Sequence, residues 1–407
     1  MPKGVHSAGF RRRVARRPIA DMPLRAVLVG AILALALNAC GSEDGQLGPE
    51  GNFSLISAGD EHSCAVMEGG QEVWCWGANE DGQLGDGSTV SSQVPRKVFV
   101  PGVVTALALG GRHSCALVDN GTVFCWGRNA EGQLGDGGVQ SRSMASPVFG
   151  MNGAQAIAAG YRHTCAVERG GRVLCWGSND KGQLGVGDGA GPDICGTNPP
   201  MPCSLSPAPV LGLMNGARVA AGGDEEGSHS CALDDLGLVH CWGDNDEMQL
   251  GDGTQVSRNR PLLVTDLSGI GDLATGGAHT CVVLADLTAW CWGRRYGSLF
   301  PITLLEGVVA VSSGRDFDCV RLEEGAMHCW GDNDDGQLGD GSRVDRVIPA
   351  QVGGLVVSAS AHGGGHSCAI DDVFQVWCWG RNTDGQLGPT PLLYSSVPVP
   401  LLGPQPD

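Results

Sequence analysis

The sequence predicts an all-β fold, a seven-bladed β-propeller with one disulfide-bonded hairpin per blade. Three observations support this prediction. A unit that ends in Cys-Trp-Gly occurs seven times, and most copies lie 49 or 50 residues apart. Three or four short strands fit into each unit, which is the content of one propeller blade. The chain also contains 66 glycines, which supply the tight turns that short strands need.

The chain begins with the features of an export signal. Residues 1–39 hold seven basic residues and a single acid, and they end in an apolar run over 26–39. This run is too short to cross a bilayer comfortably, so residues 1–39 are predicted to be a signal peptide. Translation from Met22 would also give a complete short signal.

The apolar run ends in Leu37-Asn38-Ala39-Cys40, which resembles the lipobox of bacterial lipoproteins. The resemblance implies that Cys40 is acylated and becomes the first residue of the mature chain. The protein would then be exported and held by lipid to a bacterial membrane, at the outer membrane or the cell surface. The alternative is an ordinary signal peptide followed by an incidental cysteine.

The remaining chain divides into a flexible linker at 40–54, the propeller at 55–402 and a tail at 403–407. Beyond residue 39 there are 19 basic and 43 acidic residues. Such a body repels phosphate backbones, so nucleic acid is not expected as a partner.

Each unit follows one order of elements, as the second unit illustrates. Two strand-like stretches, 103–109 and 113–118, precede a turn at 119–121, and a third strand follows at 122–126. A polar loop at 127–137 leads to a short strand containing proline, which suits the outer edge of a sheet. The corresponding last stretch of the chain, 397–402, is predicted to pair with the first blade and to latch the ring.

The repeats resemble those of the regulator of chromosome condensation family. The pattern Trp-Gly-x-Asn-x-x-Gly-Gln-Leu-Gly occurs at 126–135 and at 379–388, and Ala-Gly-Tyr-Arg-His occurs at 159–163. The resemblance covers about 55–402 and implies a seven-bladed propeller. It does not imply nucleotide exchange, because one fold hosts many functions.

The 17 cysteines suit an oxidising compartment. Cys40 is assigned to the lipid, and two cysteines, Cys195 and Cys203, lie together in an insertion at 186–209. The others form one pair per unit, facing each other across the predicted hairpin: Cys64 with Cys75, Cys115 with Cys125, Cys165 with Cys175, Cys231 with Cys241, Cys281 with Cys291, Cys319 with Cys329 and Cys368 with Cys378. Reduced core thiols and zinc ligation are the alternatives to disulfides.

Recurring polar residues raise the question of a metal site. Six units carry a histidine two residues before the first cysteine, at His62, His113, His163, His229, His279 and His366, and the sixth unit has Phe317 there. We expect hydrogen bonds between blades from these histidines, and core packing between blades from the tryptophans. The acidic stretches at 244–247 and 332–335 do not fit an EF-hand. We therefore predict no metal, no cofactor and no catalytic residues.

Two segments break the repeat and are the candidate binding region. One is the insertion at 186–209, and the other is a shortened segment at 294–300 that has lost the Gln-Leu-Gly loop. Arg294, Arg295, Tyr296 and Phe300 are the candidate partner-binding residues, because arginine and aromatic residues are enriched at binding hot spots. Both segments follow a Cys-Trp-Gly strand, so they are expected on the same face.

Taken with the export signal, these features predict a non-catalytic, membrane-anchored scaffold that binds a protein partner and is itself a monomer. An extracellular propeller enzyme or a carbohydrate-binding protein is the first alternative. Activity like that of a guanine-nucleotide exchange factor, by analogy with the family, is the second.

Overall fold

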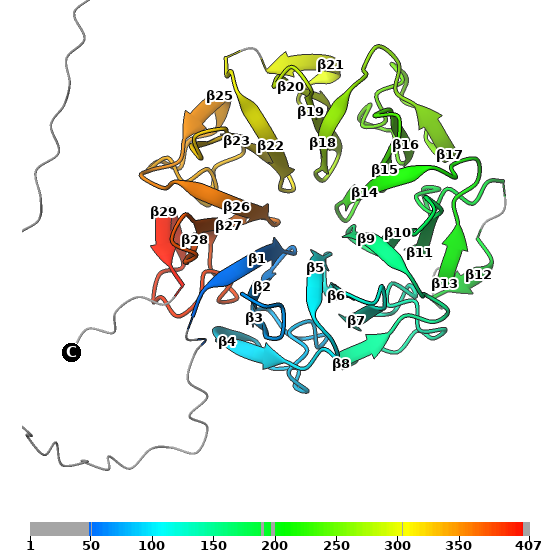
Figure 1. Ribbon diagram of the computed structural model, residues 1–407, viewed down its shortest axis with the longest axis horizontal. Helices are drawn as coiled ribbons and strands as arrows, with labels where there is room; N and C mark the ends of the chain where they lie inside the picture. Colours follow the sequence, from blue (N-terminus) through cyan, green and yellow to red (C-terminus); the bar gives the residue numbers. More distant parts are fainter. Residues whose placement is uncertain (1–48, 50, 189–190, 197–199, 303, 402–407) are drawn as a thin grey trace, which may run out of the picture. The chain divides into compact units, whose positions relative to one another are not determined.

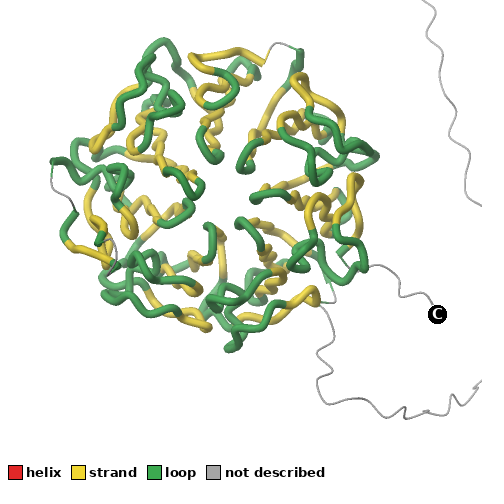
Figure 2. The backbone as a smooth tube through the Cα atoms, turned by 180° about the vertical axis from the view of Figure 1, so that it is seen from behind, coloured by secondary structure: helices red, strands yellow, loops and turns green. Residues whose placement is uncertain are grey.

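The computed structural model describes residues 49, 51–188, 191–196, 200–302 and 304–401. These residues form seven antiparallel sheets arranged radially around a central channel (Figure 1). Seen from behind, strands and loops alternate around the whole ring (Figure 2). The predicted all-β seven-bladed propeller is confirmed.

Each blade takes its strands from consecutive stretches of chain. The strands of blades one to three are β1 (Phe53–Ala58), β2 (His62–Met67), β3 (Val73–Gly77), β4 (Ser92–Val98), β5 (Val104–Leu109), β6 (His113–Val118), β7 (Val123–Gly127), β8 (Arg142–Pro147), β9 (Ala154–Ala159), β10 (His163–Glu168), β11 (Val173–Ser178), β12 (Asp193–Cys195) and β13 (Met201–Pro209). Those of blades four and five are β14 (Gly216–Gly223), β15 (Ser228–Asp234), β16 (Val239–Gly243), β17 (Arg258–Leu263), β18 (Ile270–Thr275), β19 (His279–Leu284), β20 (Ala289–Gly293) and β21 (Gly297–Ile302). Those of blades six and seven are β22 (Val308–Ser313), β23 (Phe317–Leu322), β24 (Met327–Gly331), β25 (Arg346–Gln351), β26 (Val357–His362), β27 (His366–Asp371), β28 (Val376–Arg381) and β29 (Tyr394–Pro400).

The last strand does not latch the ring, so that prediction was wrong. β29 pairs with β28 in its own blade, with Cys378 opposite Val399. Every repeat supplies at least four strands of its own. Blade one is therefore complete with β4, and no position in its sheet is left for a strand from blade seven. The ring closes instead through contacts such as the bond from the Phe53 amide to the Phe374 carbonyl, at 3.0 Å.

The insertion at 186–209 contains the outer strand of blade three as well as additional chain. β13 pairs with β11, in the position that the other blades give to their fourth strand, and β12 extends this sheet to five strands. Part of the predicted insertion is therefore a regular element of its blade. The three prolines of β13 lie on a strand near the edge of a sheet, where a missing N–H is tolerated.

All eight predicted disulfides are present, and each pairing is the one expected from the sequence. They join Cys64 to Cys75, Cys115 to Cys125, Cys165 to Cys175, Cys195 to Cys203, Cys231 to Cys241, Cys281 to Cys291, Cys319 to Cys329 and Cys368 to Cys378. The cysteines of the propeller are therefore disulfide-bonded, and they are neither reduced core thiols nor zinc ligands.

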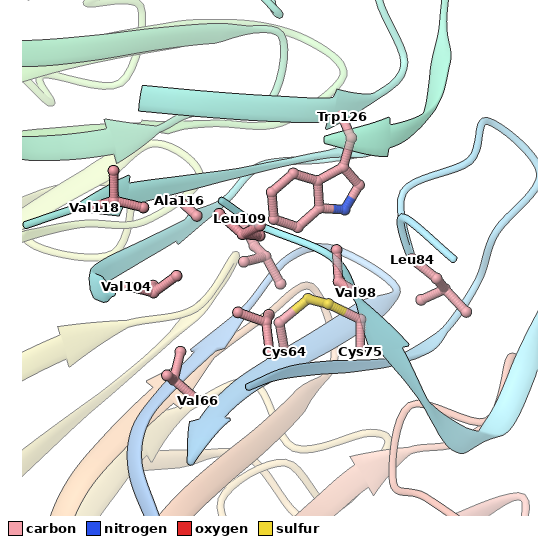
Figure 3. Packing of buried hydrophobic residues seen from close by; sticks show 12 residues of the cluster. Cys64, Val66, Cys75, Leu84, Val98, Val104, Leu109, Ala116, Val118 and Trp126 are labelled. Carbon is pink, nitrogen blue, oxygen red and sulfur yellow. A yellow bond between two sulfur atoms is a disulfide. The ribbon is translucent and has the colours of Figure 1, made fainter. Parts of the chain in front are cut away.

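The short turn of each hairpin explains this pairing. Residues equidistant from a hairpin turn face each other, so the turn fixes the register of both strands. In blade two, Cys115 on β6 lies directly opposite Cys125 on β7, with the Cα atoms 4.1 Å apart. The hairpin disulfides all lie in the cores between blades, as the Cys64–Cys75 bond does beneath Trp126 and Val98 (Figure 3).

No helix in these described stretches is long and apolar enough to cross a membrane. The predicted signal peptide, Cys40 and most of the linker lie outside the described residues.

Candidate functional site

Six of the seven interfaces between blades use one set of contacts. The tryptophan of Cys-Trp-Gly donates its Nε1–H to the backbone carbonyl of the glutamine in the preceding blade's Gln-Leu-Gly loop, over 2.8–2.9 Å. The leucine of that loop is buried beside the same tryptophan, as Leu84 is beside Trp126 (Figure 3). Core packing between blades, the role expected for the tryptophans, is therefore observed.

The repeated histidines also connect neighbouring blades. In five interfaces the buried Nε2 atom lies 2.8–2.9 Å from a serine or threonine hydroxyl of the next blade: His62–Ser114, His113–Thr164, His163–Ser230, His229–Thr280 and His366–Ser63. Burial lowers the pKa of His62, His113, His229 and His366 to about 3. These rings are therefore neutral and structural at ordinary pH, as expected from the sequence.

Blade five departs from this arrangement because it lacks the Gln-Leu-Gly loop. A tight turn, Arg294-Arg295-Tyr296, joins β20 directly to β21. The Tyr296 hydroxyl takes the place of the missing glutamine carbonyl: it accepts the Nε1–H of Trp330 at 2.6 Å. The same hydroxyl donates to Oδ2 of Asp318, also at 2.6 Å.

Three residues in blades six and seven differ from the repeat where the Tyr296 hydroxyl replaces the glutamine carbonyl. Asp318 stands where the other blades carry serine or threonine, because a phenolic hydroxyl needs an acceptor where a carbonyl needed a donor. Its other carboxylate oxygen lies 2.9 Å from Nε2 of His279. Phe317 replaces the sixth histidine, and His362 bonds Ser367 instead, at 2.9 Å.

The charges of this cluster are set by the same contacts. Burial and the neighbouring Asp318 carboxylate both raise the pKa of Tyr296, which keeps the phenol protonated. Burial alone would raise the pKa of Asp318, but His279, Ser313 and Tyr296 bring it below its ordinary value. The network therefore holds one buried carboxylate surrounded by donors, which is the condition for a stable buried charge.

The missing loop leaves a cavity of about 580 Å³ between blades five and six, which we call the five–six cavity. Its walls are mostly apolar: Phe300, Pro301, Ile302, Leu304, Val347, Ile348 and Pro349, together with Trp330. Polar groups lie among them, from Arg295, Tyr296, Asp345 and Arg346. Val347 is 94% exposed and Phe300 is 52% exposed, so the cavity opens to solvent through apolar side chains.

The four candidate partner-binding residues divide into two kinds. Arg294 is occupied within the molecule, because its guanidinium lies 3.2 Å from both Asp224 and Asp316. Tyr296 belongs to the buried network. Arg295 and Phe300 line the five–six cavity and remain exposed.

Sequence reasoning missed Val347 and Ile348, which form the opposite wall of the cavity. Val347 follows Arg346 on β25, and the matching positions in other blades carry Ser143, Asn259 and Ser396. Blade three also carries an apolar residue at this position, Leu205, so the residue type alone does not mark the cavity. Val347 is exposed because it lies where the missing loop would have covered β25.

The second break in the repeat begins at the equivalent end of its blade. Gly177 of β11 pairs with His163, and Gly293 of β20 pairs with His279, so the two third strands end at matching positions. The insertion and the 294–296 turn therefore leave their blades at the same end, as predicted.

The acidic stretches considered for calcium have different surroundings. In one, the amine of Lys181 lies 3.1 Å from Asp244 and 2.9 Å from Asp246, which offsets one of the two negative charges. In the other, Asp332 and Asp334 meet Asp345, with carboxylate oxygens within 4.8 Å of one another. Among the described residues, no group of three possible ligands contains a histidine.

The mouth of the central channel is lined largely by glycine backbone. Asp60 of blade one and Arg315 of blade six form an ion pair across it. A side chain at Gly364 would collide with Asp60, so this glycine of blade seven leaves room for the pair. The remaining cavity is only about 80 Å³.

Comparison with known proteins agrees with this geometry. Solved structures with the same fold include human WBSCR16, with a TM-score of 0.69 and 21% identity over 81% of this chain and 88% of that one. Yeast RCC1 (Prp20), solved bound to Kap60, has a TM-score of 0.68 and 18% identity over 92% and 91% of the two chains. These similarities concern the fold.

Two curated relatives are more similar in sequence over shorter stretches. The human E3 ubiquitin-protein ligase HERC2 is 31% identical over 147 residues, which are 32% of this chain and 3% of the ligase. The ultraviolet-B receptor UVR8 of Arabidopsis thaliana is 30% identical over 162 residues, which are 35% of this chain and 37% of the receptor. The match therefore spans well under half the length of either relative.

The family models match most of the chain. The RCC1-like domain matches residues 37–299, and the regulator of chromosome condensation (RCC1) repeat matches residues 308–337 and 324–370. The first match alone covers more than half of the sequence, and the seven blades observed here agree with it. The chain belongs to the RCC1-like domain family.

Proposed function

We propose that this protein is a non-catalytic interaction module that receives a segment of a protein partner in the five–six cavity. The observation that carries the proposal is the exposed apolar wall of Phe300, Val347 and Ile348 where a structural loop is missing. Exposed apolar side chains around a cavity of this size are typical of binding sites. Yeast RCC1, which shares the fold, was solved with the protein Kap60 bound.

The chemistry of the cavity defines the partner segment. An aliphatic side chain would bury the exposed faces of Phe300 and Val347. Arg295 at the rim forms no ion pair within the described part of the chain, so an acidic residue next to the aliphatic one would gain a partner. A short acidic segment carrying a leucine meets both requirements.

A display selection tests the cavity directly. Linear peptides are selected on the protein spanning residues 41–407 and are then measured against Phe300→Ala and Val347→Asp variants. Truncating an anchor typically costs on the order of 1–3 kcal/mol, so binding should weaken about fivefold or more. Phe149→Ala is the matched control, because Phe149 is a 70% exposed phenylalanine in blade two. Equal binding to all variants would refute the assignment of the cavity.

We further propose that the module acts outside the bacterial cytoplasm, held to a membrane through Cys40. The Leu-Asn-Ala-Cys site supports the anchor. The eight disulfides support an oxidising compartment, since cytosolic thiols stay reduced.

A further inference from the structure

The linker before the propeller repeats the sequence of the loop that blade five lacks. Residues 43–48, Glu-Asp-Gly-Gln-Leu-Gly, are identical to residues 80–85 of the blade-one loop. Residues 44–49 are likewise identical to residues 384–389 of the blade-seven loop. The family match also begins at residue 37, well before the first strand at Phe53. The chain thus has a spare copy of the loop and one blade without a loop.

The complete interfaces show how such a loop binds. The leucine enters the core between two blades, where Leu84 is fully buried. In blades one, two, three and six the loop backbone also bonds the outer strand of the next blade, as where the Gly87 amide donates to the Ser143 carbonyl at 2.8 Å. In blade seven, whose loop shares the sequence Gln-Leu-Gly-Pro with the linker, the equivalent Thr390 amide bonds the Gly388 carbonyl instead.

At the five–six cavity these receiving groups are present without a loop. Val347 occupies the strand position of Ser143, because Arg346 pairs with Gly331 just as Arg142 pairs with Gly127. The apolar space for a leucine is the five–six cavity itself. The Trp330 N–H differs from these groups, because it already donates a hydrogen bond to the Tyr296 hydroxyl.

We propose that residues 43–48 of a second copy of this chain occupy the five–six cavity. This inference rests on the proposed function and names its partner. Leu47 fills the apolar space, as Leu84 does in the core between blades one and two. Glu43 and Asp44 bring negative charge to Arg295, on a molecule that is otherwise strongly acidic.

The length of the linker favours a second copy over the chain's own linker. Gly48 lies five residue steps before Phe53, so the chain between them spans at most about 18 Å. Phe53 starts β1, the innermost strand of blade one, whereas the cavity borders β25, the outermost strand of blade six. Strands lie about 4.8 Å apart, so the radial step alone takes about 14 Å. The two blade steps around the ring remain to be crossed, and the linker is too short for both.

The contact joins different surfaces of two molecules. It either closes as a reciprocal pair or continues as a row of molecules. Both outcomes differ from the monomer expected from the sequence.

Isotope-resolved crosslinking tests the proposal. A benzophenone amino acid replaces Leu47 in the 41–407 protein, and equal amounts of ¹⁴N- and ¹⁵N-labelled protein are mixed and irradiated. Mixed-isotope crosslinks from position 47 to residues 295–304 or 345–349 are expected. Crosslinks to these residues within a single copy would overturn the choice of a second copy. Crosslinks confined to other regions, or none at all, would overturn the proposal.

Sedimentation supplies an independent readout. Leu47→Asp and Val347→Asp should each weaken self-association at least tenfold, and mixing the two variants should restore a one-to-one complex through the intact linker and the intact cavity. Leu236→Asp is the control, because Leu236 is 74% exposed in blade four. A wild-type protein that stays monomeric at all concentrations, or that associates as strongly with Leu47→Asp, overturns the proposal. If peptides selected on the cavity still depend on Phe300 and Val347 in that case, the proposed function stands and only its partner was wrong.

Discussion

Replacing Tyr296 with phenylalanine removes one hydroxyl from the buried network between blades five and six. The Trp330 N–H loses its acceptor and the Asp318 carboxylate loses one donor, while His279 and Ser313 still serve Asp318. A buried polar group left without a partner costs about 1–3 kcal/mol. The five–six cavity borders both Tyr296 and Trp330, so water can reach the gap and reduce the loss.

We therefore expect Tyr296→Phe to lower the free energy of unfolding by about 2–3 kcal/mol. For a ring of this size, that corresponds to a fall in Tm of about 3–4 °C. Denaturant titration and calorimetry, both with the disulfides intact, measure the two quantities. The chain has only three tyrosines, and the other two are natural controls. Tyr161→Phe loses an exposed bond to Glu225 and Tyr394 lies on the surface, so each should change stability by less than about 0.5 kcal/mol.

A double-mutant cycle identifies the group that is left unpaired. In a protein that already carries Trp330→Phe, no indole N–H can be left without an acceptor. Tyr296→Phe should therefore lower the free energy of unfolding by clearly less than it does in the wild type. A loss for Tyr296→Phe no larger than that of the Tyr161 control would refute the network as described. An unchanged loss on the Trp330→Phe background would refute the role of the indole.

Three further outcomes are expected. Cys40→Ser should release the protein from membranes, and unchanged fractionation with no acyl mass on the amino terminus would exclude the anchor. Intact mass under non-reducing conditions, after alkylation, should show that none of the sixteen propeller cysteines is free; alkylation of several of them in exported protein would contradict the pairing. Stability should fall as pH drops from about 6.5 towards 3, because histidines such as His113 have a pKa near 3 when folded, below the ordinary 6.5, so the unfolded chain takes up protons first. Each such histidine should cost about 2 kcal/mol at pH 5, and His113→Gln should reduce the proton uptake on unfolding by close to one.

Local pairings could be predicted from the sequence because a short turn determines them. Cys115 and Cys125 flank a turn that fixes their register, so their bond follows from spacing alone. The same holds for Cys165 and Cys175 in the next blade. The pairing of the last strand could not be obtained in this way. The stretch at 397–402 looked the same whether it completed blade seven or crossed to blade one, and the choice depended on whether blade one already had its fourth strand.

At the candidate site, too, the local feature could be predicted from the sequence and the long-range contacts could not. The lost loop at 294–300 was visible as a break in the repeat, and it does mark the cavity. The roles of its residues were not visible, because Tyr296 is held by Asp318 and Trp330, which lie 22 and 34 residues further along the chain. Phe317 and Asp318 differ from the residues of the other repeats. This difference was the available sign that the contacts between blades five and six are not those of the other interfaces.

The absence of a strand shared between the first and last blades has a consequence for how the chain can be reconnected. Blades seven and one meet through the same kinds of side-chain contact as other neighbouring blades, such as the bonds from His366 to Ser63 and from Trp76 to the Gln386 carbonyl. The contacts between blades therefore do not depend on which two blades carry the chain ends. A circular permutant opened in the turn at 149–153, with its original ends joined, should keep all seven blades and every disulfide. In this architecture the order of synthesis is separable from the order of assembly, and whole blades are the units that can be rearranged.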